Sequence, residues 1–333
     1  MPTAQVHGLL TEKEISPVNE QTNIMNNSPL VTVFMISYNQ QDYVIEALES
    51  IMSQQVDFSY HIILSDDCST DDTQKVVDKF LENHPKKNLV TFIKQKKNLG
   101  WMPNFIFTLE KCVQTGAKYI AMCEGDDFWV NEHKLKKQID LLEENPDVVL
   151  ACHQYKELYN DGNLAERPYF RKDFFNGQHS FKFFQKDFEE FMRIQTMTIV
   201  FRTSSLDLSL QKKYQYYCDT HIKHHILDHG MGIYTKDFDA IYRIHGNNVF
   251  MSLDERKKTK FSYDVYKDLI INNGSERYRN LMNSAMRDRI TNELNNHKKN
   301  IFNSYYRNII WEQFTNTKSI PQFLKYIVKG IFN

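Results

Sequence analysis

Two pairs of adjacent aspartates are the most chemically suggestive residues of this 333-residue sequence. Asp66–Asp67 and Asp126–Asp127 each lie at the end of an apolar stretch that is typical of a buried strand. Neighbouring carboxylates repel one another, and burying them is costly unless a cation or hydrogen-bond donors neutralise them. Such oxygen ligands suit Mg²⁺ or Mn²⁺, which fill the rest of their coordination shell from substrate phosphates.

A second interpretation is that these aspartates only cap the helices that follow them. It is weaker for Asp126–Asp127, because Phe128 and Trp129 come before any predicted helix. In both interpretations the positions of the aspartates are set by the neighbouring strands and helices. These elements can be predicted from the hydrophobic pattern.

Strands and helices alternate through the first half of the sequence. Short apolar, β-branched runs predict strands, and apolar residues at helical spacing predict helices between them. The predicted strands are 30–36, 60–64, 89–93, 118–123 and 148–152, and the helices are 42–54, a segment around 76–81, 103–115 and 132–144. This order predicts an α/β domain with a mostly parallel sheet flanked by helices. Ligands of such sheets bind beyond the carboxyl ends of strands, where both aspartate pairs lie.

The second half of the sequence is less regular. Residues 155–190 predict a long loop with short helices, 197–202 a short strand, and 216–229 a helix. Residues 255–315 have a mixed, helical and polar pattern, and residues 1–28 are polar without a sustained period. We therefore expect a flexible leader at 1–28 and a C-terminal helical extension at 251–333.

Composition argues against several classes of protein. Lys and Arg total 41 against 42 Asp and Glu, so the net charge is −1 and no basic excess supports nucleic-acid binding. The five cysteines form no CxxC pair, which favours reduced thiols over a zinc ribbon or a disulfide framework. No secretory signal and no apolar run of roughly 20 residues is present, so we expect a cytoplasmic protein whose membrane contact is at most peripheral.

Five motifs in order carry a resemblance to a known family. They are Val31-Thr-Val-Phe-Met-Ile-Ser-Tyr-Asn39, Ala47-Leu-Glu-Ser-Ile-Met-Ser-Gln54, Ser65-Asp-Asp-Cys-Ser-Thr-Asp-Asp-Thr73, Asn98-Leu-Gly100 and Glu124-Gly-Asp-Asp-Phe-Trp129. Together they resemble the family 2 glycosyltransferases of the GT-A fold, of the type that builds bacterial polysaccharides and surface glycans. The resemblance is close over residues 30–155 and looser over 195–250. It implies a catalytic domain at 29–250, with a nucleotide-sugar half at 29–155 and an acceptor half at 156–250.

The resemblance also implies a donor site and a metal. The residues implied in binding the nucleotide sugar are Ile36, Tyr38, Asn39, Asp67, Asn98 and Asp126. Asp67 is expected to hydrogen-bond the base, and Asp126 to lie near the ribose. Asp127 is expected to bind the Mn²⁺ or Mg²⁺ that bridges the diphosphate, because a cation stabilises the charge on that leaving group. His245 either completes this site or is a structural histidine; both roles are open.

An inverting transfer needs a base that takes the proton from the attacking hydroxyl. The family places an acidic residue well downstream of the metal motif, followed by a Tyr-Arg-x-His segment, which is Tyr242-Arg-Ile-His245 here. Asp219 is therefore the expected base, with Asp228 as the reserve candidate. The alternative role of Asp219 is that of a helix N-cap.

Three other features have weaker assignments. Trp101 and Trp129 could each stack on a sugar or acceptor, with core packing equally open for Trp101; Trp129, beside the metal motif, is the residue expected to contact the acceptor. Four histidines recur at helical spacing: His221, His224, His225 and His229. We expect them on a solvated or acceptor-facing helix rather than in a zinc site, because the pattern fixes no cysteine or acidic partner. The tail at 301–333 is cationic and aromatic, so peripheral contact with an anionic membrane and packing on the catalytic domain are both open.

The leading hypothesis is thus a metal-dependent inverting transferase that moves a sugar from a nucleotide diphosphate, with UDP favoured, to a glycan or lipid-linked acceptor. The Gln-x-x-Arg-Trp motif of processive members is absent, which favours addition of a single sugar. Ile36 stands where many members have Pro, and Cys68 where Gly or Asn is common; neither change removes a functional group. The alternatives are a metal-dependent nucleotidyltransferase, which no glycine-rich phosphate loop supports, and a protein that binds nucleotide sugars without catalysis.

Overall fold

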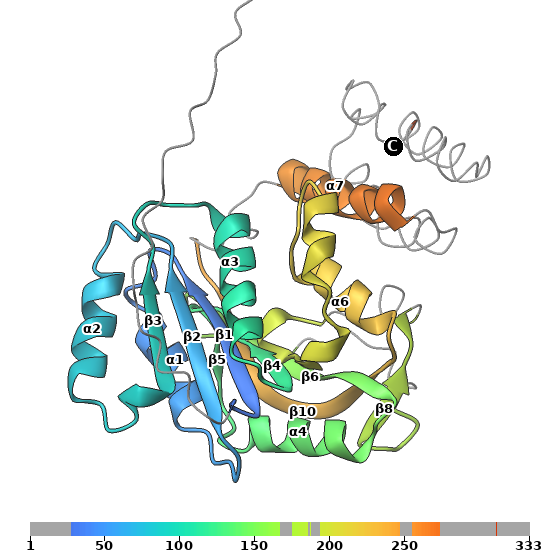
Figure 1. Ribbon diagram of the computed structural model, residues 1–333, viewed down its shortest axis with the longest axis horizontal. Coiled ribbons are helices and arrows are strands. Elements are labelled where there is room, and N and C mark those ends of the chain that lie inside the picture. Colours follow the sequence, from blue (N-terminus) through green and yellow to red (C-terminus); the bar gives the residue numbers. More distant parts are fainter. Residues whose placement is uncertain are drawn as a thin grey trace, which may run out of the picture.

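The computed structural model describes residues 28–166, 175–185, 187, 194–246, 255–273 and 311. Its centre is a ten-stranded sheet in the order β3-β2-β1-β4-β9-β6-β10-β5, with β7 paired to β6 and β8 to β10 (Figure 1). The first-half elements are β1 (Val31–Ser37), α1 (Val44–Met52), β2 (Tyr60–Asp66), α2 (Thr73–Asn83), β3 (Val90–Lys94), α3 (Trp101–Gln114), β4 (Tyr119–Met122), β5 (Phe128–Trp129) and α4 (Lys134–Glu144). The second-half elements are β6 (Val148–Tyr159), β7 (Leu164–Glu166), β8 (Ser180–Phe183), β9 (Val200–Arg202), α6 (Asp219–Leu227), β10 (Met231–Ile244) and α7 (Glu255–Asn273).

The predicted mostly parallel α/β sheet is confirmed. β3, β2, β1 and β4 are parallel neighbours, with Val31 opposite Tyr60 on one side and Tyr119 on the other. β9 runs antiparallel between β4 and β6, and β6 and β10 are again parallel. The carboxyl ends of β1, β2 and β4 therefore meet at one edge of the sheet, as the sequence predicts.

Alternate residues of the central strands feed two separate hydrophobic cores. Phe34 packs with Phe105 and Leu109 of α3 on one face, in a core that also takes residues of α6. Val33 and Met35 point to the other face, where they pack with residues of α1 and α4. This follows from the two-residue period of a strand, and it covers both faces of the sheet with helices. Figure 1 shows α3 over β1 and β2, and α4 along β6.

The second half differs from the sequence prediction. The loop predicted for 155–190 contains the end of β6, all of β7 and all of β8. The long strand β10 was not predicted at all. β10 pairs with β6 from Val148 to Tyr159. The start of β6 is a local apolar run, whereas β10 and the second half of β6 are specified by this long-range pairing.

Short helical turns complete the described part of the chain: η1 (Lys87–Leu89), η2 (Thr196–Thr198), η3 (Thr203–Ser205) and η4 (Leu208–Lys213). η2 replaces the first part of the strand predicted at 197–202. Among the described residues, no helix is both long and apolar enough to cross a membrane. The expected leader lies outside the described residues except for residue 28, as does the tail at 301–333 except for Trp311.

Candidate active site

The loops after β1 and β2 are tied together by side-chain to backbone hydrogen bonds. Asn39 has a φ of 52° and Cys68 a φ of 59°, so both residues turn the chain sharply just past a strand end. The Asn39 amide N–H donates to Ser69 Oγ at 2.8 Å, and the Thr70 amide N–H donates to Asn39 Oδ1 at 2.8 Å. Asn39 thus braces the neighbouring loop, while the adjacent Tyr38 side chain is 45% exposed and open to a ligand.

Asp67 and Asn98, two residues predicted to bind the donor, lie in contact. Asp67 Oδ1 accepts from the Leu99 amide at 2.7 Å and Oδ2 from the Gly100 amide at 2.9 Å. Asn98 Nδ2 donates to the Asp67 carbonyl at 3.1 Å. Burial raises the pKa of Asp67, and the two amide N–H groups partly oppose this rise. In this structure Asp67 therefore positions the 98–100 loop beside the strand ends.

Three carboxylates gather just after β4. One oxygen each of Glu124, Asp126 and Asp127 lies within 4.8 Å of the others. Burial and the charges of Asp126 and Glu124 raise the pKa of Asp127 well above its ordinary value. Burial, helped by Asp126 and Asp219, raises the pKa of Glu124 to about 8. Glu124 and Asp127 are thus costly to ionise in this cluster until a cation is present.

An orphaned oxygen supports a cation at this cluster. Asp127 Oδ2 is buried and has no hydrogen-bond partner among the described residues, whereas Oδ1 accepts from the Arg243 amide at 2.9 Å. A buried carboxylate oxygen without a donor is unfavourable in water-free surroundings, and a divalent metal satisfies it. The residues present therefore fit Mn²⁺ or Mg²⁺. Glu124 was missed as a site residue because it stands outside the aspartate pair.

Gly125 lets this acidic turn approach β1. Its amide donates to the Ile36 carbonyl at 2.9 Å. A Cβ at position 125 would lie 2.4 Å from Gln40 Oε1 and 3.0 Å from the Ile36 carbonyl oxygen. Ile36 thus contributes its backbone to the site, and only a glycine leaves room for that contact.

The end of β10 supports the acidic turn from the other side. Arg243 Nη1 donates to the Asp126 carbonyl at 2.7 Å, and Nη2 lies 2.5 Å from Glu46 Oε2. The guanidinium lies 4.8 Å from the ring centres of both Tyr43 and Phe128. Arg243 is 7% exposed, so this cation is held rigidly behind the carboxylates.

His245 lies where the sequence places it, beside the predicted metal site. Its Nε2 is 3.0 Å from Asp126 Oδ2, and its ring centre is 4.6 Å from that of Tyr43. The side chain is buried. In this structure the imidazole holds Asp126, which is a supporting contact typical of metal sites.

Asp219 shares the electrostatic environment of the acidic cluster. It is the first residue of α6, and its Oδ2 lies 2.6 Å from Lys223 Nζ and 3.4 Å from Thr196 Oγ1. Burial opposes ionisation, but Lys223, the Thr220 amide and the Thr196 hydroxyl together outweigh it and lower the pKa of Asp219 below its ordinary value. The charge of Asp219 contributes to the raised pKa of Glu124, so the two carboxylates influence each other electrostatically.

The competing roles for Asp219 are less well supported. The N-cap of α6 is Cys218, so Asp219 is not the capping residue. The reserve candidate Asp228 is the C-cap at the opposite end of α6, exposed, with its Oδ1 accepting from Gln185 Nε2 at 3.0 Å.

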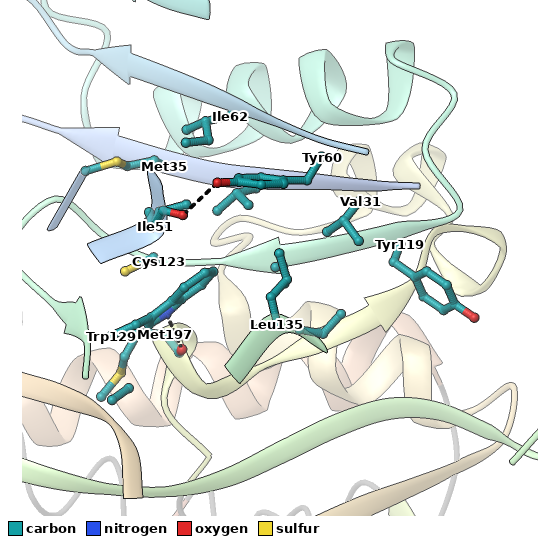
Figure 2. Packing of buried hydrophobic residues seen from close by; sticks show 14 of the residues in the cluster. Val31, Met35, Ile51, Tyr60, Ile62, Tyr119, Cys123, Trp129, Leu135 and Met197 are labelled. Atoms are coloured by element: carbon teal, nitrogen blue, oxygen red, sulfur yellow. Dashed lines mark hydrogen bonds between the residues drawn. The ribbon is translucent and has the colours of Figure 1, made fainter. Parts of the chain in front are cut away.

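The expected acceptor role of Trp129 is wrong for this conformation. The indole is 4% exposed and lies in the core near Tyr60 and Leu135 (Figure 2). Its Nε1–H donates to the Met197 carbonyl at 3.0 Å, and Lys134 Nζ lies 4.0 Å from the ring centre. Both the polar edge and a face of the ring are therefore engaged inside the protein.

The histidines of α6 are not on a solvated face. His221, His224 and His225 are buried, and His229 alone of the four is exposed. Within the described residues, the only group of three or more potential metal ligands close enough to share an ion is the acidic cluster. The expected solvated helix is thus wrong for these three histidines, and the acceptor-facing alternative stays a prediction.

Comparisons with known proteins agree with this geometry. A sequence model described as glycosyl transferase family 2 matches residues 32–208, more than half of the chain. The uncharacterized protein Rv1520 of Mycobacterium tuberculosis is 34% identical over 134 residues, which are 40% of this chain and 37% of that protein. The putative teichuronic acid biosynthesis glycosyltransferase TuaG of Bacillus subtilis is 28% identical over 142 residues, 43% of this chain and 53% of that protein. The chain thus matches about a third to a half of the length of these relatives.

Two solved structures resemble the whole fold. TarS 1-349 of Staphylococcus aureus, in complex with UDP-GlcNAc, has a TM-score of 0.64 at 15% identity. The match covers 91% of this chain and 88% of the TarS chain. The mannosyltransferase PcManGT of Pyrobaculum calidifontis, in complex with GDP-Man and Mn²⁺, has a TM-score of 0.52 at 14% identity, with 95% and 91% of the two chains covered. At such identities the likeness shows the fold alone, and it confirms the predicted GT-A arrangement.

Proposed function

Because the chain belongs to glycosyl transferase family 2, we propose that it transfers a sugar from a nucleoside diphosphate to a hydroxyl group, with inversion and with a divalent cation. The observation that carries this proposal is the cluster of Glu124, Asp126 and Asp127, together with the influence of Asp219, a residue distant in sequence, on the pKa of Glu124. The three clustered carboxylates supply oxygen ligands, and Asp219 is held ionised by a buried lysine.

The cation would be held by Asp127, with Asp126 and Glu124 beside it. Bound there, Mn²⁺ or Mg²⁺ supplies positive charge that offsets the charge developing on the departing diphosphate. Asp127 offers its buried Oδ2, while Oδ1 is fixed by the Arg243 amide. Asp126 is oriented by His245, so the protein holds its carboxylates in place before the donor arrives.

The donor would lie across the carboxyl ends of β1, β2 and β4. Tyr38 and Asn39 line the base side together with Asp67 and Asn98, and the backbone of Ile36 joins this loop to the acidic turn. UDP is favoured, with support from the UDP-GlcNAc complex of TarS; the GDP-Man complex of PcManGT makes GDP the first alternative to test.

Asp219 would act as the base. Its carboxylate takes the proton of the acceptor hydroxyl as the new C–O bond forms, and the bond to the diphosphate breaks with its electron pair leaving on the nucleotide. The name of TuaG favours a glycan or lipid-linked acceptor, as in surface-polysaccharide synthesis. Peripheral membrane contact through the tail at 301–333 stays a prediction, because that segment lies outside the described residues.

A nucleotide-release assay tests the proposal. UDP-glucose, UDP-GlcNAc and GDP-mannose are incubated with the full chain, with Mn²⁺, with Mg²⁺ and with EDTA. We expect release of the nucleoside diphosphate from one donor class, dependent on the cation. Asp219→Asn should lose on the order of 100-fold or more in turnover and still bind the donor, as measured by thermal shift. Wild-type turnover in Asp219→Asn would remove the base assignment, whereas donor binding without any release would favour a binding protein.

A further inference from the structure

A buried lysine contacts the expected base. Lys223 is 4% exposed and lies four residues after Asp219 on α6. Its Nζ is 2.6 Å from Asp219 Oδ2 and donates to the Ile194 carbonyl at 2.8 Å. Removing an ammonium from water costs several kcal/mol, and replacing a buried ion pair by apolar residues is often neutral or stabilising. Stability alone is therefore a weak reason for this lysine.

The side-chain hydrogen bonds of Asp219 reach only one of its two carboxylate oxygens. Both side-chain donors, Lys223 Nζ and Thr196 Oγ1, reach Oδ2. Oδ1 receives no side-chain hydrogen bond from the described residues, and the Asp219 side chain is 26% exposed. The Thr220 amide also hydrogen-bonds this carboxylate. The side-chain donors thus fix Oδ2, and Oδ1 keeps lone-pair capacity for a ligand.

Lys223 also joins the two segments that build this corner of the site. Asp219 begins α6, whereas Ile194 and Thr196 belong to the segment that enters η2. A single ammonium bridges the Asp219 carboxylate and the Ile194 carbonyl. Lys223 makes the shorter of the two side-chain contacts to Oδ2, so its loss would hold the carboxylate more loosely without removing the carboxylate itself.

We propose that Lys223 is a positioning residue for glycosyl transfer, holding Asp219 Oδ2 so that Oδ1 faces the acceptor hydroxyl. The inference rests on the proposed function, with Asp219 as the base. The acceptor proton then moves to Oδ1, the acceptor oxygen forms its bond to the sugar, and the nucleoside diphosphate leaves with the electrons of the broken bond. Lys223 touches neither substrate in this step and acts through Asp219 alone.

Lys223→Met tests the proposal, because methionine keeps the length of the side chain and removes its charge and donors. The assay is diphosphate release from the donor that the wild type turns over, with water as the acceptor. We expect kcat to fall about 10- to 100-fold, less than the roughly 100- to 10,000-fold contribution of a general base, because the carboxylate itself stays; KM for the donor should change less than about three-fold. Lys182→Met is the matched control, because Lys182 pairs with Asp147 at a surface site that the mechanism does not use; it should leave kcat unchanged.

A double-mutant cycle distinguishes a positioning role of Lys223 from a general loss of structure in the variant. If Lys223 acts only through Asp219, then Lys223→Met should cause no further loss in the Asp219→Asn background. Additive losses, or wild-type kcat in Lys223→Met, would overturn the inference. If Lys223→Met fails to fold, as judged by circular dichroism, Lys223→Arg keeps the charge and enters the same cycle with the same expected non-additivity. An active Asp219→Asn variant would instead overturn the base assignment, so the two failures are distinguishable.

Discussion

Burial of histidines on α6 predicts a specific acid sensitivity. His225 is 4% exposed, and its Nε2 has no hydrogen-bond partner among the described residues. Burial, partly opposed by Asp228, lowers its pKa from 6.5 to about 4. The folded state therefore keeps His225 neutral at a pH where the unfolded chain takes up a proton. Stability from this residue is present above the unfolded pKa and is lost as the pH falls from about 6.5 towards 4.

The size of the effect follows from these two pKa values. Between pH 7 and pH 5, protonation of the unfolded state alone lowers the free energy of unfolding by about 2 kcal/mol for His225. In His225→Leu this contribution disappears. We therefore expect the difference in unfolding free energy between variant and wild type to shift by about 2 kcal/mol in favour of the variant over that pH range.

Urea unfolding followed by circular dichroism at pH 7, 6 and 5 measures this shift. Comparing the two proteins at each pH cancels the titration of the site carboxylates, which both share. His133→Leu is the control, because the His133 side chain is 57% exposed; its difference from the wild type should not change by a comparable amount. Parallel pH profiles for wild type and His225→Leu would refute the reasoning, since they would mean that His225 is solvated or paired in solution.

The remaining predictions concern the site and its support. Asp127→Ala should abolish Mn²⁺ binding measured by isothermal titration calorimetry, because it removes the orphaned oxygen; unchanged affinity would exclude Asp127 as a ligand. Arg243→Met should weaken Mn²⁺ binding roughly 10-fold by releasing the acidic turn, as losses of supporting contacts at metal sites do. An affinity equal to that of the wild type would show that the turn holds its shape without Arg243. Trp129→Phe should lower the free energy of unfolding by about 1 kcal/mol through the lost hydrogen bond, with KM for the acceptor unchanged; a large rise in that KM would restore the acceptor role.

The first half of the fold could be predicted from sequence because its strands are buried on both faces. β1 and β2 are nearly continuous apolar runs, and their ends locate Asp67 and the loop that carries Asn39. β10 could not be predicted in this way, because Lys236, Asp237 and Asp239 interrupt its apolar pattern and its pairing partner lies far away in sequence.

The main errors in predicting the site from the sequence concerned the direction in which side chains point. Trp129 follows the metal motif in sequence, but Phe128 and Trp129 are consecutive residues of β5 and point to opposite sides. Phe128 therefore faces Arg243, whereas Trp129 enters the core. The burial of the α6 histidines was not predicted for a related reason. Their spacing indicates a helix but does not indicate that other elements cover this helix on several sides.

The hydrogen bond between the Arg243 amide and Asp127 joins residues 116 positions apart. A chain emerging from the ribosome therefore makes its acidic turn long before it makes the strand that braces it. Until β10 pairs with β6, the turn lacks both the Arg243 clamp and His245, so cation affinity should arrive late, with the closing of the sheet. A fragment ending before residue 231 would carry every expected metal-binding aspartate and still lack the framework that makes them a site.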